Sequence, residues 1–223
     1  MNPWRFNRAL SYIRRPFLCR DLDDSREILW GIRNCIDAGL YLTDLCINGR
    51  LKANSQEMKK LHSELSKVRG KEFNIRIGKL LERNPDLCLI YPIKKFGDRR
   101  MVDSEGKDLG DIDVLAINKK TKKLKIIECK DLALARTPYE MGNELKNIFE
   151  GSDNEKSIIK KHSRRCDWVK RNLGSVLKYL ELDEKANWKI EPIIIVDQEL
   201  FTPYLRKSPI KVLSFSELKP GDI

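Results

Sequence analysis

Apolar residues recur three or four positions apart through much of the first third of the chain, as they do on one face of an α-helix. This pattern predicts a helix over residues 24–47, which opens on a capping pattern, and a second helix over residues 54–69. Gly70 marks either a break or a change of stripe. A new apolar face beyond it predicts a helix over residues 71–83, because Asn84-Pro85 stops it.

Short runs rich in Val, Ile and Leu predict strands farther along the chain. "LCLIYPI" (87–93) is one such strand, and residues 110–130 form two strands joined by a Lys-rich turn. Residues 96–110 are rich in Gly, Asp and Arg, and we expect a loop there. The strand over residues 190–197 has the continuous apolar run of a strand covered on both faces, and residues 210–215 complete the sheet.

Two helices are predicted between these groups of strands. "TPYE" is a strong helix start, with Thr137 as the cap and Pro138 in the first helical position, and Gly151 should end that helix. A longer helix is predicted over residues 155–181. Its inner stripe is formed by Ile159, His162, Cys166, Val169, Leu173, Val176 and Leu180.

The order of these elements predicts an α/β protein in which a central mixed β-sheet is flanked by helices. Residues 67–223 are expected to form this core, and residues 1–66 a helical N-terminal extension. Residues 1–20 mix arginine with aromatic residues. That mixture would suit either packing on the domain or contact with nucleic acid, and we favour packing.

Composition adds an expectation about partners and location. The 223 residues carry a net charge of +11, which favours nucleic acid or another polyanion as partner, although a merely soluble basic protein is the alternative. The six cysteines do not have zinc-ligand spacing. No apolar run approaches the roughly 20 residues of a membrane span, and no signal peptide opens the chain. We therefore expect a soluble, cytoplasmic protein without a membrane partner.

Charged residues occur in the predicted hairpin where its strands should be buried. Side chains alternate along a strand, so Glu128 and Lys130 face the same side. If the turn is centred between Lys120 and Thr121, Asp113 lies directly across from Glu128. Charge on a buried strand face is costly, so the cluster must have a compensating interaction.

Two carboxylates this close repel one another unless a cation lies between them. Lys130 supplies one positive charge, and a divalent ion would supply more, because carboxylate oxygens suit Mg²⁺ or Mn²⁺. A structural salt-bridge cluster is the alternative, and the strand geometry favours the metal site. Asp111 is a rival to Asp113, but Asp113 has the position opposite Glu128.

This arrangement resembles the PD-(D/E)XK nuclease superfamily, whose motif places an acidic residue at the start of one strand and (D/E)-X-K on the next. Asp113 and Glu128-Cys129-Lys130 match the motif. Glu72, in "RGKEFNIRIGKLLE", matches the glutamate that the family often has on the preceding helix. The motif's proline is absent here, as it often is in the superfamily. The resemblance covers about residues 67–215 and extends to uncharacterised bacterial nuclease-like proteins of this superfamily. It implies a restriction-endonuclease-like core with the element order αβββαβ.

The resemblance also implies a reaction, the metal-dependent hydrolysis of phosphodiester bonds. Asp113, Glu128 and the backbone carbonyl of Cys129 would hold one Mg²⁺, for which Mn²⁺ could substitute. Lys130 would orient or help to deprotonate the attacking water, and Glu72 would bind a second metal or anchor its water. DNA is the favoured substrate, in repair, restriction or defence, and RNA stays open.

Basic residues of the helix predicted over 155–181 are candidates for contact with nucleic acid. They are Lys160, Lys161, Arg164 and Arg165. A solvated helix face is an equally good interpretation of this run. His162 is more simply explained as a core residue with satisfied hydrogen bonds.

Two other functions are compatible with the same residues. The first is a nucleic-acid-binding module that keeps the nuclease-like fold with little or no catalytic activity. The second is an interaction domain whose charged cluster is only a salt bridge. A homodimer, or a larger parent protein of which this chain is a portion, is also compatible with the sequence.

Overall fold

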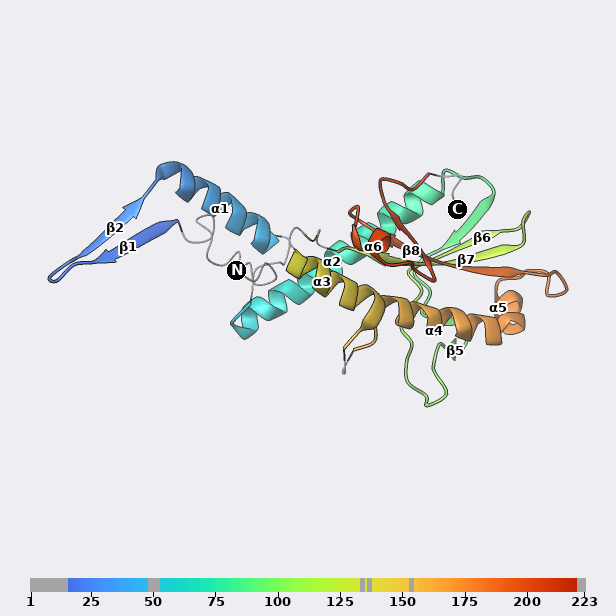
Figure 1. Cartoon of the computed structure of the whole chain (residues 1–223). Helices are drawn as coiled ribbons and strands as arrows, with labels where there is room; N and C mark the ends of the chain where they lie inside the picture. The colour runs from blue at the N-terminus through green and yellow to red at the C-terminus, as the bar shows by residue number, and fades with distance from the viewer. Residues whose placement is uncertain (1–15, 48–52, 133–134, 136–137, 153–154, 220–223) are drawn as a thin grey trace. The chain divides into compact units, whose positions relative to one another are not determined.

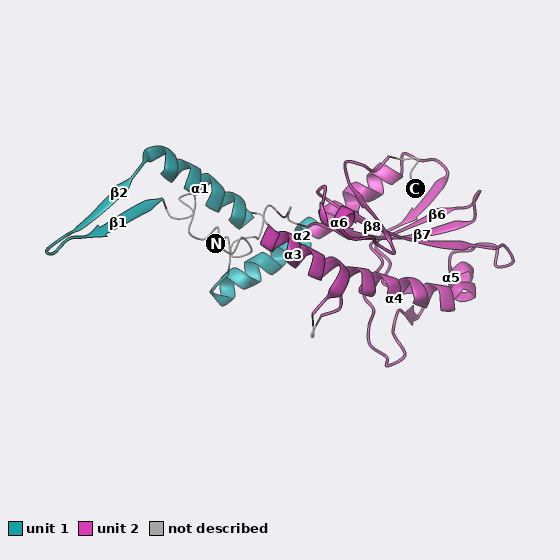
Figure 2. Cartoon of the chain, viewed as in Figure 1, with its two compact units in different colours: residues 1–69 teal, residues 70–223 magenta. Residues whose placement is uncertain are grey.

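The computed structural model describes residues 16–47, 53–132, 135, 138–152 and 155–219 (Figure 1). The chain divides into two compact units, residues 1–69 and 70–223 (Figure 2). The division falls within one continuous helix, α2 (Gln56–Leu81), as does the boundary expected from the sequence after residue 66.

The first unit contains a β-hairpin that the sequence analysis did not predict. Strands β1 (Phe17–Asp21) and β2 (Arg26–Trp30) pair antiparallel, and the helix α1 (Ile32–Ile47) follows them. The helix expected from residue 24 therefore begins eight residues late. Cross-strand ion pairs and β-branched or aromatic residues favour the hairpin over the helix here. The rest of the arm expected over residues 1–20 lies outside the described residues.

Helix α2 passes through Gly70 without a break, so the glycine marks a change of stripe. A glycine in a helix interior costs only about 1 kcal/mol relative to alanine. The packing of Phe73, Ile77 and Leu81 against the sheet offsets that cost. The face that α2 presents to the sheet thus begins just after Gly70.

The second unit is built on a five-stranded sheet. Its strands are β3 (Leu87–Ile90), β6 (Val114–Asn118), β7 (Lys123–Lys130), β8 (Lys189–Val196) and β9 (Lys211–Ser214), which lie side by side in that order. The pairs β3–β6 and β6–β7 are antiparallel, whereas β7–β8 and β8–β9 are parallel. The predicted mixed sheet is confirmed.

Helices cover both faces of this sheet, which confirms the α/β fold class (Figure 1). Helix α2 packs on one face, and α4 (Ile158–Arg171) and α5 (Leu173–Tyr179) pack on the other. Alternate residues of β8 enter cores on opposite faces: Ile193 lies in one and Ile194 in the other. This arrangement explains the continuous apolar run of that strand.

The helix expected over residues 155–181 is divided in two. Ser157 caps α4, its hydroxyl accepting a hydrogen bond from the Lys160 N–H at 3.2 Å. At the other end, the Asn172 side-chain amide donates to the Trp168 carbonyl at 2.8 Å, and α5 begins after Asn172. The local competition of an asparagine side chain with the backbone accounts for the break.

The remaining elements are short. Helix α3 (Pro138–Leu145) continues as a π-helical turn (Lys146–Glu150) and ends at Gly151, which has a φ of 82°. The predicted cap, Thr137, lies outside the described residues. The expected loop over 96–110 includes a small hairpin of β4 (Lys95–Phe96) and β5 (Arg99–Arg100), and α6 (Thr202–Leu205) precedes β9. None of the helices described is long and apolar enough to cross a membrane.

Candidate functional site

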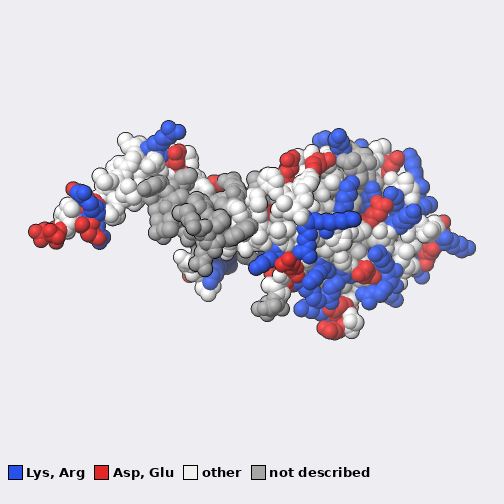
Figure 3. Space-filling model, in the orientation of Figure 1, with Lys and Arg blue, Asp and Glu red and all other residues white. Residues whose placement is uncertain are grey.

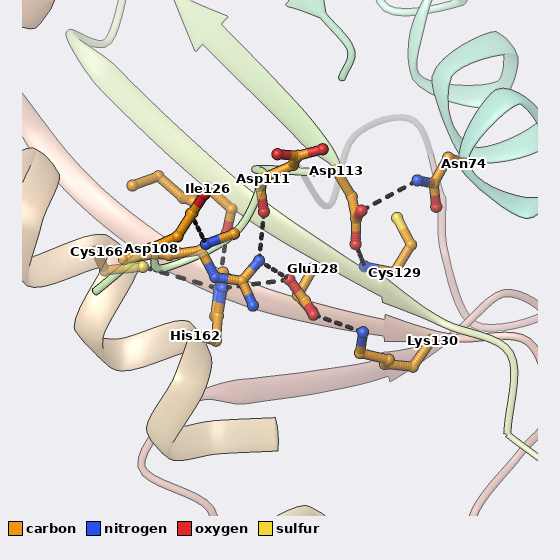
Figure 4. Close-up of polar contacts among 12 residues, drawn as sticks. Asn74, Asp108, Asp111, Asp113, Ile126, Glu128, Cys129, Lys130, His162 and Cys166 are labelled. Atoms are coloured by element: carbon orange, nitrogen blue, oxygen red, sulfur yellow. Dashed lines mark hydrogen bonds and ion pairs between the residues drawn. The ribbon is translucent and has the colours of Figure 1, made fainter. Parts of the chain in front are cut away.

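The register of the β6–β7 hairpin brings Asp113 to the end of β7. Asn118 pairs with Lys123, so the turn is centred between residues 120 and 121 as predicted. Asp113 comes one residue before β6, opposite Glu128 in the continued register. Its Oδ2 accepts a hydrogen bond from the Cys129 backbone N–H at 2.8 Å (Figure 4). The register of the two strands and this backbone hydrogen bond therefore help to position the carboxylate.

Glu128 lies in the interior between two cations. Its side chain is 3% exposed; Oε1 is 2.7 Å from Lys130 Nζ and Oε2 is 2.5 Å from Arg165 Nη1. The same Arg165 nitrogen donates to the Asp111 backbone carbonyl at 2.5 Å. Arg165 thus ties α4 both to β7 and to the segment that leads into β6. We call Asp113, Glu128, Lys130 and Arg165 the charged cluster.

The two carboxylates have opposite pKa shifts. Burial, followed by the negative charge of Glu128, raises the pKa of Asp113 above its ordinary value. Burial also acts to raise the pKa of Glu128, but the charges of Arg165 and Lys130 outweigh it and hold that pKa below its ordinary value. Asp113 receives hydrogen bonds from neutral groups, so it is the carboxylate that would gain most from an added cation.

Asn74 is a member of the site that the sequence analysis did not identify. Its side-chain amide donates to Asp113 Oδ1 at 3.1 Å (Figure 4). Glu72, the glutamate matched by resemblance, is an exposed residue of the same helix. Residues 72 and 74 project on different sides of a helix, and Phe73 between them points into the core. Asn74 lies next to this apolar stripe in the sequence, and that position could have indicated that its side chain faces the sheet.

His162 packs behind Glu128 in the interior of the domain. It is 1% exposed, and its Nε2 lies 3.1 Å from the Ile126 carbonyl. Burial lowers the pKa of His162 to about 4, so the imidazole is neutral at neutral pH. Its Nδ1 lies 4.0 Å from Glu128 Oε2 and has no hydrogen-bond partner in the described structure. The predicted core position of His162 is confirmed, and Nε2 is the ring nitrogen that has a hydrogen-bond partner.

The oxygen atoms proposed for a metal lie at one edge of the sheet. The Cys129 N–H points toward Asp113, and because backbone groups of one strand residue point the same way, its carbonyl does too. The Lys130 carbonyl instead accepts from Asp197 N–H on the β8 side. Two carboxylates and a carbonyl suit Mg²⁺, which keeps several waters.

Two features of the site limit the number of side-chain ligands that a metal ion would have. Lys130 Nζ already forms an ion pair with Glu128 Oε1, so a metal would compete with Lys130 for that oxygen. Within the part of the chain that the structure describes, no group of three or more His, Cys, Asp or Glu side chains is arranged to hold a metal ion. A metal here would therefore depend on the backbone carbonyl and on water as well as on side chains.

The basic residues predicted to contact nucleic acid lie in two different environments. Lys160 Nζ donates to the Glu150 carbonyl at 3.1 Å, Lys161 pairs with Glu155, and Arg164 pairs with Asp103, all toward the surface. Arg165 is instead 6% exposed. The interpretation of Arg165 as a surface phosphate contact is not supported, because the buried charge of Glu128 holds it inside the domain.

Comparisons with known proteins give one match. The family model described as anti-phage protein Upx-like matches residues 1–190, which include the whole first unit and every residue of the charged cluster. No curated protein and no solved structure matches the chain. The matched region covers well over half of the sequence. The chain therefore belongs to the Upx-like family of anti-phage proteins.

Proposed function

We propose that this protein is a metal-dependent nuclease that hydrolyses phosphodiester bonds in DNA as part of phage defence. The observation that carries the proposal is the convergence of Asp113, Glu128 and Lys130 at adjoining strand ends, with the Cys129 carbonyl on the same edge. These are the residues that resemble the PD-(D/E)XK motif. The anti-phage family is compatible with this role.

The residues of the charged cluster have different roles in this proposal. Asp113, Glu128 and the Cys129 carbonyl would hold Mg²⁺, which when bound makes water more acidic and offsets charge on the phosphate. Lys130 is 37% exposed at its side chain, so Nζ can reach both Glu128 and a substrate in solvent. An ammonium in that position can orient the attacking water and stabilise negative charge that develops on the phosphate.

Arg165 and Asn74 have positioning roles in this proposal. Arg165 keeps Glu128 ionised and directs Oε1 toward Lys130, because its own bond occupies Oε2. Asn74 fixes one oxygen of Asp113 and the Cys129 N–H fixes the other. Both carboxylates are thus held in place before a metal or substrate arrives, which lowers the cost of reorganisation during the reaction.

A nucleic-acid-binding module without catalysis is the second candidate. The ion pairs of Glu128 with Lys130 and Arg165 support it, since they compensate the buried charge without any metal. In that case the charged cluster would stabilise the fold, and the net charge of +11 would serve binding alone.

A cleavage assay with a matched lysine variant separates the two candidates. Purified protein is incubated with supercoiled plasmid, linear duplex, single-stranded DNA or RNA, each with Mg²⁺, Mn²⁺ or EDTA. We expect metal-dependent cleavage, reduced about 100-fold or more in Lys130→Ala because general acid–base and charge effects typically contribute that much.

Lys123→Ala is the control, because Lys123 lies on the same strand, is 36% exposed and pairs with Glu191 at 2.7 Å. Its cleavage rate should stay within about twofold of wild type, as expected for a surface ion pair. Nucleic-acid binding without cleavage by wild type would favour the binding module. Equal cleavage by wild type and Lys130→Ala would remove Lys130 from the mechanism.

A further inference from the structure

A cleft of about 510 Å³ lies beside the charged cluster. One wall is the segment before β6, the second is the segment before α4, and the third is α4 itself. The lining residues are Lys107, Asp108, Leu109, Gly110, Ser152, Glu155, Lys156, Lys161 and Arg164. Figure 3 shows Lys and Arg side chains gathered over the surface formed by residues 70–223.

The charge of the cleft is positive. Four basic side chains line it, against two carboxylates, Asp108 and Glu155. Asp108 already accepts a hydrogen bond from the Gly110 N–H at 2.7 Å, and Glu155 pairs with Lys161 at 2.5 Å. With Asp103, the partner of Arg164, also counted, three carboxylates face four basic side chains, so the cleft keeps a surplus of one positive charge.

The basic residues differ in how firmly they are held. Arg164 pairs with Asp103, whose side chain is 9% exposed. This largely buried partner holds the Arg164 guanidinium in place. Lys161 pairs with Glu155, whose side chain is 71% exposed, and such a surface pair is easily exchanged for another anion. Lys107 and Lys156 are exposed on the two loops that face one another. The cleft thus combines one cation paired with a largely buried carboxylate and three exposed ones.

Two residues that line the cleft are next in sequence to residues of the charged cluster or to their contacts. Gly110 lines the cleft, and the carbonyl of the next residue, Asp111, accepts from Arg165. Arg164 lines the cleft, and its neighbour Arg165 binds Glu128. A ligand bound in the cleft would therefore contact residues that adjoin the charged cluster.

We propose that this cleft binds the phosphodiester backbone of the nucleic-acid strand that the charged cluster acts on. The inference rests on the proposed function, and it assigns the strand-binding role to Lys107 and Lys156 together with Lys161 and Arg164. A volume of about 510 Å³ falls in the range of pockets that enclose small ligands, so it suits a short stretch of one strand. Ammonium and guanidinium groups are the usual partners of phosphate oxygens.

The test measures binding apart from cleavage. Fluorescein-labelled single-stranded DNA of 20 nucleotides is titrated with the full chain in EDTA, and anisotropy is followed at several salt concentrations. For Lys107→Ala/Lys156→Ala we expect about tenfold weaker binding near 0.1 M salt. The slope of log K against log salt should become less negative by about 1.4, because each lost contact to a single strand removes about 0.7 from its magnitude.

Lys178→Ala/Lys185→Ala is the matched control, since it removes the same charge from exposed residues outside the cleft. Its affinity should stay within about twofold of wild type, and unchanged melting temperatures would show that both variants fold. Equal losses in the two variants, no loss in the cleft variant, or no binding by wild type would each overturn the proposal. If binding depends on the cleft but no metal-dependent cleavage occurs, the strand-binding role of the cleft would be supported and the proposed nuclease activity would be rejected.

Discussion

Asp113 and Glu128 carry like charges on neighbouring strands but have different kinds of partner. Glu128 is neutralised by Arg165 from inside and by Lys130 from the solvent side. Asp113 is held by the amide of Asn74 and a backbone N–H, which orient it without supplying a full positive charge. The cluster is therefore most receptive to a cation on the Asp113 side, where the Cys129 carbonyl also points.

His162 makes the stability of the fold depend on pH. Burial lowers its pKa to about 4, and among its charged neighbours Glu128 opposes that shift while Arg165 and Lys130 reinforce it. An unfolded histidine titrates near pH 6.5, so the unfolded chain binds more protons between these values. The contribution of His162 to the free energy of unfolding should be nearly constant well above pH 6.5 and should fall by about 3 kcal/mol as the pH approaches 4.

Urea unfolding in EDTA at pH 7 and pH 5 measures this dependence. His162→Gln keeps a donor for the Ile126 carbonyl and cannot titrate, so its free energy of unfolding should change less between the two pH values. His62→Gln, at the other histidine of the chain, should keep the wild-type dependence. An equal slope for wild type and His162→Gln would show that other groups control the acid sensitivity.

Sequence reasoning located the residues of the site that depend on local geometry. Asp113, Glu128 and Lys130 followed from strand alternation and from the centre of one turn, which involve only neighbouring strands. Asn74 and Arg165 lie 39 and 37 residues from the carboxylates that they contact. Arg165 lies three residues after His162 and four before Val169, so helical spacing already placed it on the inner face of α4 and the basic run around it concealed this. Its partner, Glu128, required the tertiary structure.

At the scale of elements, the hydrophobic pattern was sufficient where burial determines the structure. The alternation and runs of β6, β7 and β8 match strands packed between helices, and all three were predicted. It failed over residues 17–30, where every strand residue is exposed and cross-strand pairs determine the structure. The break at Asn172 was also missed, since a single side-chain hydrogen bond decides it.

Two glycines of α2 should respond oppositely to alanine. A Cβ at Gly70 meets nothing within 4 Å, so Gly70→Ala should raise the free energy of unfolding by about 0.5–1 kcal/mol through helix propensity. A Cβ at Gly78 would lie 2.5 Å from the Tyr91 ring, whose hydroxyl donates to Glu82 at 2.9 Å. Gly78→Ala should therefore lower the free energy of unfolding by about 1–3 kcal/mol.

Urea denaturation of the two variants under the same conditions checks this pair. Each substitution is the control for the other, because both add one methyl group to the same helix. Equal destabilisation by both would mean that α2 does not tolerate alanine generally. Equal stabilisation would mean that the Tyr91 ring moves aside, so that the close packing of α2 on the sheet is less restrictive than its geometry indicates.

At the scale of the whole molecule, the two units differ in how they bury apolar side chains. The charged cluster, the cleft and the cores that flank the sheet all belong to residues 70–223. In the first unit, large apolar side chains are exposed on both the hairpin and α1. They include Phe17, Ile28, Leu29, Trp30, Ile32, Ile36 and Leu40. Exposed apolar surface of this extent is typical of an interaction site.

This surface leads us to expect self-association through the first unit. An isolated two-stranded hairpin is marginally stable in water. The charged residues of its strands pair across the hairpin, Arg20 with Glu27 and Asp21 with Arg26, while Asp23 and Asp24 lie in the turn. The apolar side chains on the strands and on α1 suit a second copy of the same surface, and two-fold homodimers are the commonest oligomers. Light scattering should give about twice the 26.0 kDa mass of the chain.

Trp30→Ser/Ile36→Ser should shift that mass to the monomer, because it removes two side chains that are 59% and 56% exposed. Phe201→Ser, which alters a side chain that is 57% exposed in the second unit, should leave the dimer intact. Both variants should cleave naked DNA as wild type does if the site works within one copy. A monomeric wild type would contradict self-association through the apolar surface of the first unit.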